Sequence, residues 1–185
     1  QNLKRKLVAI MFTDIVDYTA QMSKDEDKAF SLIKKKRNLL SPLLKKYKGT
    51  LIKEIGDGTL SRYFKADYAI DCATQFQSKT DTELNIRAGI HMGKVIIDKE
   101  DVFGDVVNIA SRLESLAIPG SIFVSKETID KLELSNKVEL VPLGMQSLKG
   151  VGRLIEVFAI KNEGLVVPSP SMYNKNRIKI HSDKN

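Results

Sequence analysis

The sequence has little cysteine and no long apolar run. Cys72 is the only cysteine in 185 residues, so no disulfide can form within the chain. A lone thiol is typical of a reducing compartment such as the cytoplasm. No apolar run approaches the about 18 residues that cross a bilayer, and no signal peptide is recognisable. We therefore expect a soluble, cytoplasmic domain in which Cys72 is a small buried helix residue.

Negative charge is also scarce, because 23 Asp and Glu face 30 Lys and Arg and leave a net charge of +7. Such a charge suits nucleic acid, an anionic membrane surface or a polyphosphate ligand. Phe and Tyr do not interleave with Lys and Arg as they do on a base-stacking surface. We therefore expect no nucleic-acid partner.

The length suits one folded domain with a substantial core, and no internal repeat is present. The chain begins at Gln1 rather than Met. We therefore expect a fragment or a processed product, with room for an upstream sensor or membrane domain that would place it at the cytoplasmic face of a membrane.

The N-terminal half combines strand and helix patterns. Residues 7–12 form a continuous apolar run, typical of a strand buried on both faces, which leads to Asp14. Apolar residues at helical offsets predict an amphipathic helix over 25–47, whose basic run 34–37 is expected to face solvent. A hairpin with strands at 50–55 and 59–64 should follow, so that Asp57 occupies its tight turn.

The remaining chain continues this mixed order. The expected elements are a helix marked by residues 66–76, strands at 84–91 and 93–98, a helix over 106–117 capped by Asp105, and strands near 121–124, 137–143 and 154–160. The order predicts an α+β fold with a ferredoxin-like βαββαβ core, an antiparallel sheet with helices packed on it. The expected divisions are a linker at 1–6, one domain at 7–162 and a polar, basic, flexible tail at 163–185.

Two carboxylates stand where neighbouring strands could bring them together. Asp14 follows the first strand and Asp57 lies in the hairpin turn. Two adjacent carboxylates repel each other unless a cation lies between them, and hard oxygen ligands suit Mg²⁺ or Mn²⁺. The alternative is that Asp14 caps the next helix and Asp57 is only a turn residue.

A second pair lies on the third predicted helix. Asn108 and Arg112 are four residues apart, so they project from one helix face and could address one ligand. The planar Arg112 guanidinium suits a phosphoryl group that gains negative charge. The alternative is an ordinary solvated face.

Four segments resemble the class III adenylyl/guanylyl cyclase catalytic domain. They are FTDIV (12–16), KEIGDG (53–58), DVFGDVVNIASRLE (101–114) and SLKGVG (147–152). Four motifs in the expected order are far more specific than any one of them. The resemblance, which covers about Leu7 to Ile160, implies the class III cyclase fold and a bacterial-type adenylate cyclase that converts ATP to 3′,5′-cyclic AMP and pyrophosphate.

The resemblance also implies roles for individual residues. The matches are Asp14 and Asp57 as metal-binding acids, the Ile15 carbonyl as a backbone metal ligand, Lys53 and Asp101 as the purine-reading pair, Asn108 as the ribose-orienting residue, Arg112 as the transition-state arginine and Lys149 as a ligand of the terminal phosphates. An ammonium at Lys53 and a carboxylate at Asp101 fit adenine, whereas similar guanylyl cyclases typically carry Glu and Cys there.

The implied mechanism is in-line attack of the ribose 3′-hydroxyl on the α-phosphorus, with two Mg²⁺ or Mn²⁺ ions per active site. In this family the metal acids come from one subunit and the purine, ribose and transition-state residues from the other. The resemblance therefore implies a homodimer with two composite sites and an inactive monomer.

Two residues and several rival functions stay open. Asp17 stands where relatives often have Gly, and it either weakens phosphate binding or faces solvent harmlessly. His91 is expected to be structural, because the family uses metal activation instead of a general base. The rival functions are a noncatalytic nucleotide-binding or dimerisation module and a guanylate cyclase. A diguanylate cyclase is disfavoured because the GG(D/E)EF turn is absent.

Overall fold

The computed structural model describes residues 3–133 and 137–176, and eight strands of this part form one sheet. In sheet order they are β2 (Thr50–Ile55), β3 (Gly58–Tyr63), β1 (Arg5–Ile15), β4 (Ile86–Asp98), β6 (Ile122–Ser125), β8 (Leu154–Ile160) and β7 (Leu140–Ser147), with β5 (Asp101–Phe103) paired to the end of β4. All neighbours are antiparallel except β4 and β6, which are parallel.

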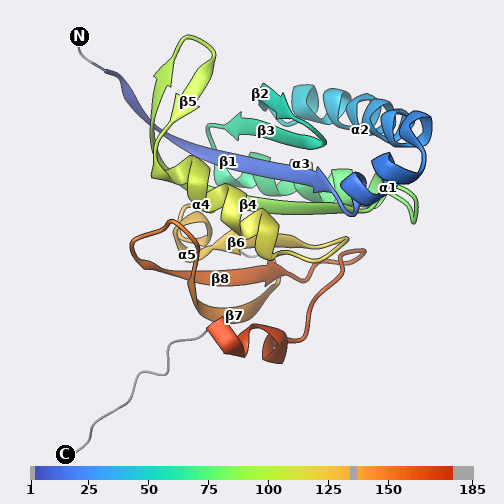
Figure 1. Ribbon diagram of the computed structural model, residues 1–185. Coiled ribbons are helices and arrows are strands. Elements are labelled where there is room, and N and C mark those ends of the chain that lie inside the picture. Colours follow the sequence, from blue (N-terminus) through green and yellow to red (C-terminus); the bar gives the residue numbers. More distant parts are fainter. Residues whose placement is uncertain (1–2, 134–136, 177–185) are drawn as a thin grey trace, which may run out of the picture.

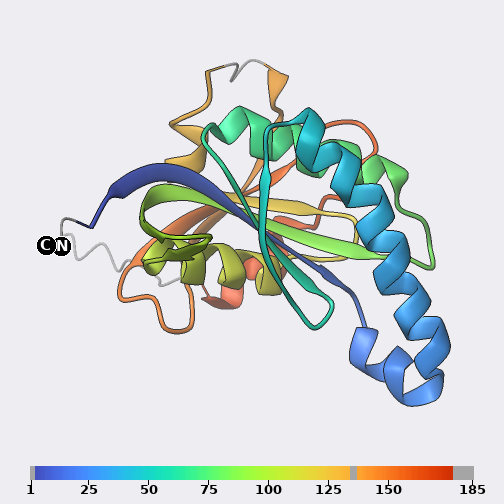
Figure 2. The same cartoon turned by 90° about the horizontal axis from the view of Figure 1, so that it is seen from above.

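Helices cover both faces of this sheet. They are α1 (Tyr18–Lys24), α2 (Glu26–Lys46), α3 (Ala66–Lys79), α4 (Asp105–Leu116) and α5 (Lys126–Ile129), with the 3₁₀ helix η2 (Pro170–Asn176) near the end of the described part. α2 and α3 lie behind the sheet and α4 in front of it (Figures 1 and 2). None of the helices in the described ranges combines the length and apolar character that a bilayer crossing requires.

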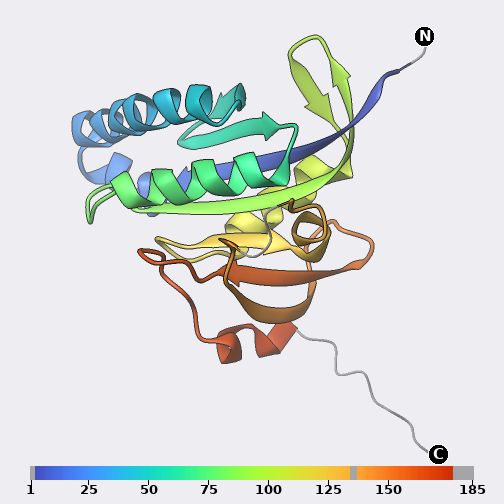
Figure 3. The ribbon, with the colours of Figure 1, turned by 180° about the vertical axis from the view of Figure 1, so that it is seen from behind.

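The predicted core is confirmed. The elements β1, α2, β2, β3, α3 and β4 follow one another along the chain, and their strands lie in the order β2-β3-β1-β4. This is the antiparallel βαββαβ arrangement that the sequence predicts. The sheet continues beyond β4 through β6, β8 and β7, which form the lower layer in Figure 3.

β1 is buried on both faces, as its unbroken apolar run predicts. Ala9 and Met11 pack with the α2 and α3 side chains, whereas Val8 and Ile10 pack on the opposite face with α4. Successive side chains of a strand alternate between faces, so Asp14 lies on the α4 face with Val8 and Ile10. This parity directs the Asp14 carboxylate away from α2.

Residues 84–98 do not form two strands as predicted. β4 runs without a break from Ile86 to Asp98 and pairs with β1 along its full length. Gly93 lies inside the strand, and a Cβ at this position would meet Val106 Cγ2 at 2.6 Å. This glycine therefore makes room for α4.

Smaller differences concern the elements next to the site. The short helix α1 and the strand β5 were not predicted. Asp105 is the first residue of α4 rather than its cap, and Gly104 takes the N-cap position with φ of 141°. An acidic residue in the first turn still stabilises the helix by its interaction with the dipole.

The prediction of a flexible tail is wrong for the first part of that segment. Tyr173 is buried against Phe123, with an edge-on ring contact at 5.5 Å between centroids. The Tyr173 hydroxyl donates to the Leu116 carbonyl over 3.2 Å, and the Val166 amide donates to the Gly120 carbonyl over 3.0 Å. These contacts hold the segment against the sheet, and residues 177–185 lie outside the described residues.

Gly89 sets how closely α4 packs on β4. A Cβ at this position would lie 2.2 Å from the Glu114 amide nitrogen and 2.7 Å from the Ala110 carbonyl oxygen, both in the α4 backbone. We predict that Gly89→Ala displaces α4 and destabilises the fold by about 2 kcal/mol, which corresponds to about 4–8 °C in melting temperature. Gly152→Ala is the control, because nothing lies within 4 Å of its Cβ position. Equal melting temperatures for the two variants would contradict the close packing.

Candidate active site

The fold brings Asp14 and Asp57 to one cleft. Asp14 is the penultimate residue of β1, and Asp57 lies in the β2–β3 turn, which reaches the same end of the sheet. The Ile15 amide donates to Asp57 Oδ2 over 2.8 Å. Asp14, Ile15 and Asp57 line a cleft of about 510 Å³ together with residues of α1. The metal-binding acids implied by the resemblance are thus close together.

The turn that presents Asp57 depends on Gly56. Ile55 pairs with Gly58, so the hairpin loop has two residues, Gly56 and Asp57. Gly56 has φ of 60° and Asp57 is not among the residues with positive φ, as expected for a type II′ turn with glycine in its first central position. The twist of such a turn matches that of the strands, so Asp57 is held at a defined place.

Lys36 lies beneath this turn, and the prediction that residues 34–37 face solvent is wrong for it. Lys36 is only 3% exposed, although it belongs to the basic run of α2. Its Nζ donates to the Asp57 carbonyl over 2.6 Å and to the Thr13 carbonyl over 3.1 Å. Burial lowers the pKa of Lys36 to about 8, against the opposing effect of Asp57 and other acids.

Arg87 on β4 holds the carboxylate of Asp14. The two residues are cross-strand partners, and Arg87 Nε donates to Asp14 Oδ1 over 3.0 Å while Nη2 donates to Oδ2. Burial would raise the pKa of Asp14, but the hydrogen bonds from Arg87 and Glu114 and the charge of Arg87 outweigh it and lower the pKa. Asp14 is therefore ionised at neutral pH.

Glu114 on α4 completes this cluster. Its Oε1 lies 3.5 Å from Arg87 Nη2. Burial, and next the hydrogen bond and charge of the neighbouring Asp14, raise the pKa of Glu114. The Arg87 guanidinium thus lies between the carboxyl groups of Asp14 and Glu114.

The cleft has the donor set of a Mg²⁺ or Mn²⁺ site. Its lining includes the two carboxylates and Ile15, whose carbonyl is the backbone ligand that the resemblance implies. Within the described ranges, no three His, Cys, Asp or Glu side chains gather as a metal-binding group. Mg²⁺ is usually held by one or two carboxylates together with substrate phosphates and water. The residues therefore fit the implied metals, provided that Arg87 releases the oxygens of Asp14.

The predicted purine-reading pair is also assembled. Lys53 on β2 and Asp101 on β5 are 48 residues apart, yet Lys53 Nζ lies 3.2 Å from Asp101 Oδ1 and 3.3 Å from Oδ2. The Val102 amide donates to the same Asp101 Oδ1 over 2.8 Å and is the main cause of its lowered pKa, followed by Lys53. A donor and an acceptor therefore stand side by side.

α4 presents Asn108 and Arg112 as predicted. Asn108 Nδ2 donates to the Gly150 carbonyl over 3.2 Å, which places the loop with Lys149 next to this helix. Arg112 Nε is buried and has no hydrogen-bond partner in the part of the chain that the structure describes. One hydrogen-bond donor of this guanidinium is therefore not used by the described residues.

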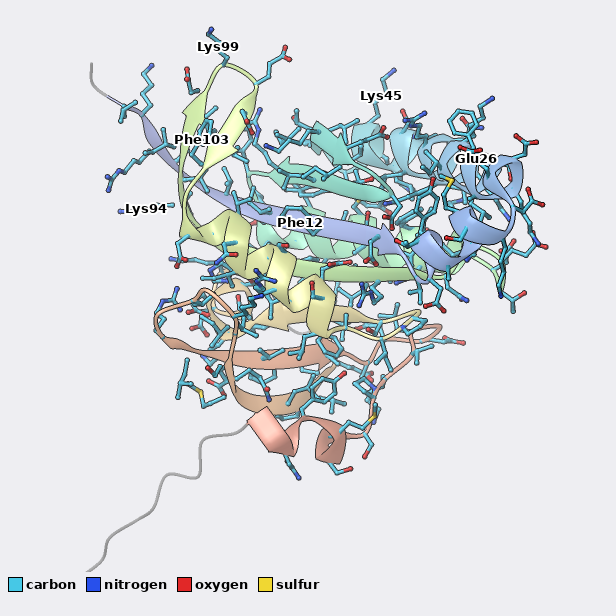
Figure 4. The ribbon with its side chains drawn as sticks, in the orientation of Figure 1. Phe12, Glu26, Lys45, Lys94, Lys99 and Phe103 are labelled. Carbon is cyan, nitrogen blue, oxygen red and sulfur yellow. The ribbon has the colours of Figure 1, made fainter. Side chains whose placement is uncertain are left out.

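The second group of predicted residues lies apart from the metal cleft. The cleft lining includes none of Lys53, Asp101, Asn108, Arg112 and Lys149. In Figure 4, Lys99 and Phe103 mark the β4–β5 hairpin at one end of the sheet, and Glu26 lies near α1 at the opposite end. The predicted site residues therefore form two separate groups on this chain.

Asp17 lines the metal cleft and adopts a left-handed conformation with φ of 57°. Glycine takes this conformation without strain, whereas Asp adopts it at a modest cost. This accounts for the glycine that relatives often carry here. The exposed Asp17 carboxylate adds negative charge to the cleft.

His91 is structural, as predicted. It is 2% exposed, and its Nδ1 lies 2.6 Å from Ser125 Oγ within the sheet. Burial lowers the pKa of His91 to about 4, with smaller effects of Glu127 and Arg153. A buried, neutral imidazole outside the cleft does not act as the general base.

This environment predicts a pH dependence. His91 should titrate near pH 4 instead of about 6.5, so below pH 6.5 only the unfolded chain takes up its proton, and stability falls between pH 6.5 and pH 4 by up to about 3 kcal/mol. NMR titration of the ring resonance, assigned with His91→Gln, measures the pKa directly. A midpoint near 6.5 would refute the burial of this ring.

Sequence reasoning missed three residues of the site: Lys36, Arg87 and Glu114. Glu114 lies within a recognised motif but was given no role, and Arg87 lies inside a largely buried strand without a signal of its own. The one usable signal for Lys36 is its helical spacing from Leu32 and Leu40, four residues on either side, which are both buried.

Comparisons with known proteins confirm the resemblance. Residues 68–162 match the family described as adenylate and guanylate cyclase catalytic domain. Putative adenylate cyclase 3 from Rhizobium meliloti is 28% identical over an alignment of 168 residues, which covers 85% of this chain and 29% of that protein. Human retinal guanylyl cyclase 2 is 27% identical over an alignment of 190 residues, which covers 89% of this chain and 17% of that protein. The chain spans less than a third of either relative.

Solved structures confirm the class III cyclase fold. The adenylate/guanylate cyclase/hydrolase from Silicibacter pomeroyi is 30% identical, with a TM-score of 0.73 and coverage of 86% of this chain and 99% of that one. The adenylyl cyclase CyaB from P. aeruginosa is 22% identical, with a TM-score of 0.76 and coverage of 88% and 97%.

Proposed function

This chain belongs to the family of adenylate and guanylate cyclase catalytic domains, and on that premise we propose that it converts ATP to 3′,5′-cyclic AMP and pyrophosphate. The observation that carries the choice of ATP is the contact between Lys53 Nζ and Asp101 Oδ1 at 3.2 Å. Lys53 donates to a ring nitrogen of adenine, and Asp101 accepts from its exocyclic amine. Guanine presents the opposite pattern of donors and acceptors.

The reaction is an in-line attack of the ribose 3′-hydroxyl on the α-phosphorus, with pyrophosphate as the leaving group. Asp14, Asp57 and the Ile15 carbonyl would hold two Mg²⁺ or Mn²⁺ ions, which would lower the pKa of that hydroxyl and neutralise the charge of the triphosphate. Asn108 orients the ribose, and Arg112 stabilises the negative charge that builds on the phosphoryl oxygens.

Lys149 contacts the terminal phosphates in this proposal. The hydrogen bond from Asn108 to the Gly150 carbonyl supports that assignment, because it places the loop that carries Lys149 beside the ribose-orienting residue. The Arg112 Nε without a partner in the described part of the chain supports an anionic ligand at the same helix.

A symmetric homodimer completes each site in our proposal. The metal cleft of one chain lacks the purine, ribose and transition-state residues, and a second copy supplies them. β2 is the edge strand, and every residue of it except Ile52 is exposed. Large apolar side chains are also exposed on β2 and β5, namely Leu51, Ile55 and Phe103. Exposed apolar groups of this kind are typical of an interaction surface.

A guanylate cyclase is the second candidate, because relatives of both specificities match the chain. The Lys53–Asp101 pair argues against it. A noncatalytic module is the third, and the bonds that engage Asp14 with Arg87 are compatible with it. Production of cyclic AMP and cyclic GMP from the two nucleotides, measured over a range of protein concentrations, separates the three.

We predict that Asp57→Ala lowers cyclic AMP production by at least about 100-fold, because it removes a metal ligand that contributes several kcal/mol to the transition state. Asp57→Asn should be as inactive while it keeps an acceptor for the Ile15 amide, so that loss of the turn is not the cause. Asp27→Ala, an exposed acid in α2, is the control. Near-normal turnover of both Asp57 variants would refute the metal assignment.

The purine assignment is tested by a double substitution. Lys53→Glu with Asp101→Cys should depress the use of ATP more than that of GTP, by about 10-fold or more in the ratio of kcat/KM, because it exchanges the donor and acceptor that meet the base. Both side chains are partly exposed, so the fold should survive. An unchanged preference for ATP would show that other residues read the base.

A further inference from the structure

β1 and the β2–β3 hairpin are joined at the cleft by bonds that do not belong to the sheet. The regular pairing of β1 with β3 ends at Thr13 and Thr59. One step further, the Ile15 amide bonds the Asp57 side chain instead of a backbone carbonyl. The Thr13 and Asp57 carbonyls both accept from Lys36 Nζ, over 3.1 and 2.6 Å. Lys36 thus joins the strand to the turn where the ladder stops.

We propose that Lys36 is a positioning residue, which fixes the distance between the Asp14 and Asp57 carboxylates so that both can hold metal. This inference rests on the proposed cyclase site and extends it to a residue of α2. Lys36 comes from the opposite side of the sheet to Asp14, reaches the underside of the turn and does not line the cleft.

The chemistry of the contacts favours positioning over charge neutralisation. Lys36 hydrogen-bonds two carbonyl oxygens, whereas Arg87 bonds the carboxylate of Asp14 itself. Lys36 therefore leaves the metal-binding oxygens free. The acids that face the ammonium electrostatically are Asp57, Asp14, Glu114 and Glu54.

Burial of the charged Lys36 ammonium costs free energy, and the hydrogen bonds to the two carbonyls must compensate for it. Desolvation of a charged amine costs several kcal/mol, so apolar side chains normally fill helix positions of this kind. Its neighbour Arg37 ties the same hairpin to α2 from the surface, through Glu54 Oε2 at 2.6 Å. The hairpin is thus already attached to the helix without Lys36, and what Lys36 adds is the link to the Thr13 carbonyl of β1.

The test measures metal binding without nucleotide, with Mn²⁺ alone as the probe and EPR of free Mn²⁺ as the readout. Lys36→Met should raise the Mn²⁺ dissociation constant by about 10-fold, and Lys36→Arg should raise it less, because a guanidinium can reach both carbonyls with altered geometry. Lys34→Met, an exposed residue of the same basic run, removes the same charge and is the matched control.

The direction in which the Mn²⁺ dissociation constant changes distinguishes a positioning role of Lys36 from a purely electrostatic one. A Lys36 that acted only as a positive charge would repel the metal, so its removal would tighten Mn²⁺ binding. Tighter or unchanged binding in Lys36→Met overturns the proposal. In turnover assays, the Mn²⁺ concentration for half-activation should rise in Lys36→Met while KM for ATP at saturating Mn²⁺ changes less than about 2-fold, which a general loss of structure would not produce.

Two further comparisons distinguish failure of the Lys36 proposal from misfolding of Lys36→Met and from failure of the proposed function. If Lys36→Met does not fold, Lys36→Arg alone decides, since Mn²⁺ binding equal to that of the unsubstituted chain would overturn the proposal. Failure of the proposed function appears differently, as Mn²⁺ binding that Asp57→Ala leaves unchanged or as absence of cyclic nucleotide from the unsubstituted chain.

Discussion

β1 pairs with β3 along one edge and with β4 along the other. The position of the cleft follows from where each of these two pairings ends. Pairing with β3 stops at Thr13, whereas pairing with β4 continues to Ile15. The last residues of β1 are therefore held on one edge only, and the other edge is left to side chains. Asp57 and Lys36 fill it with bonds that a backbone ladder would otherwise make. An opening for ligands thus forms without loss of order in the strand.

Arg87 and Lys36, the two cationic residues beside this cleft, differ in whether the proposed metal binding would break their hydrogen bonds. Arg87 bonds both oxygens of Asp14 and would have to release them to a metal ion in the proposed site. Glu114 lies 3.5 Å from Arg87 Nη2 and offers it another carboxyl group. Lys36 bonds only carbonyls and can stay where it is. One cation therefore competes with the metal, while the other supports the turn.

Sequence patterns predicted the parts of the fold whose signals are local. The apolar run of β1, the α2 periodicity and the glycines around Asp57 each indicate one element, and motif order indicated the family. The continuity of β4 across residues 91–93 was missed, because the reason for Gly93 is the approach of α4 from elsewhere in the chain. Lys36 was missed for the same kind of reason, since its burial depends on carbonyls of two distant segments. Local sequence patterns carry no information about such long-range packing.

Two faces of α4 carry residues that point to different parts of the proposed sites. Glu114 points to Arg87 in the metal cleft of its own chain, whereas Asn108 contacts the Gly150 loop and carries a predicted role at the ribose. In the proposed dimer, this ribose belongs to the ATP whose metals the other chain holds. The backbone of α4 rests directly on Gly89, where there is no space for a Cβ. Because α4 carries Asn108 and Arg112 as well as Glu114, its packing on β4 places these residues relative to Asp14, and in the proposed dimer the geometry of each composite site depends on the packing of both chains.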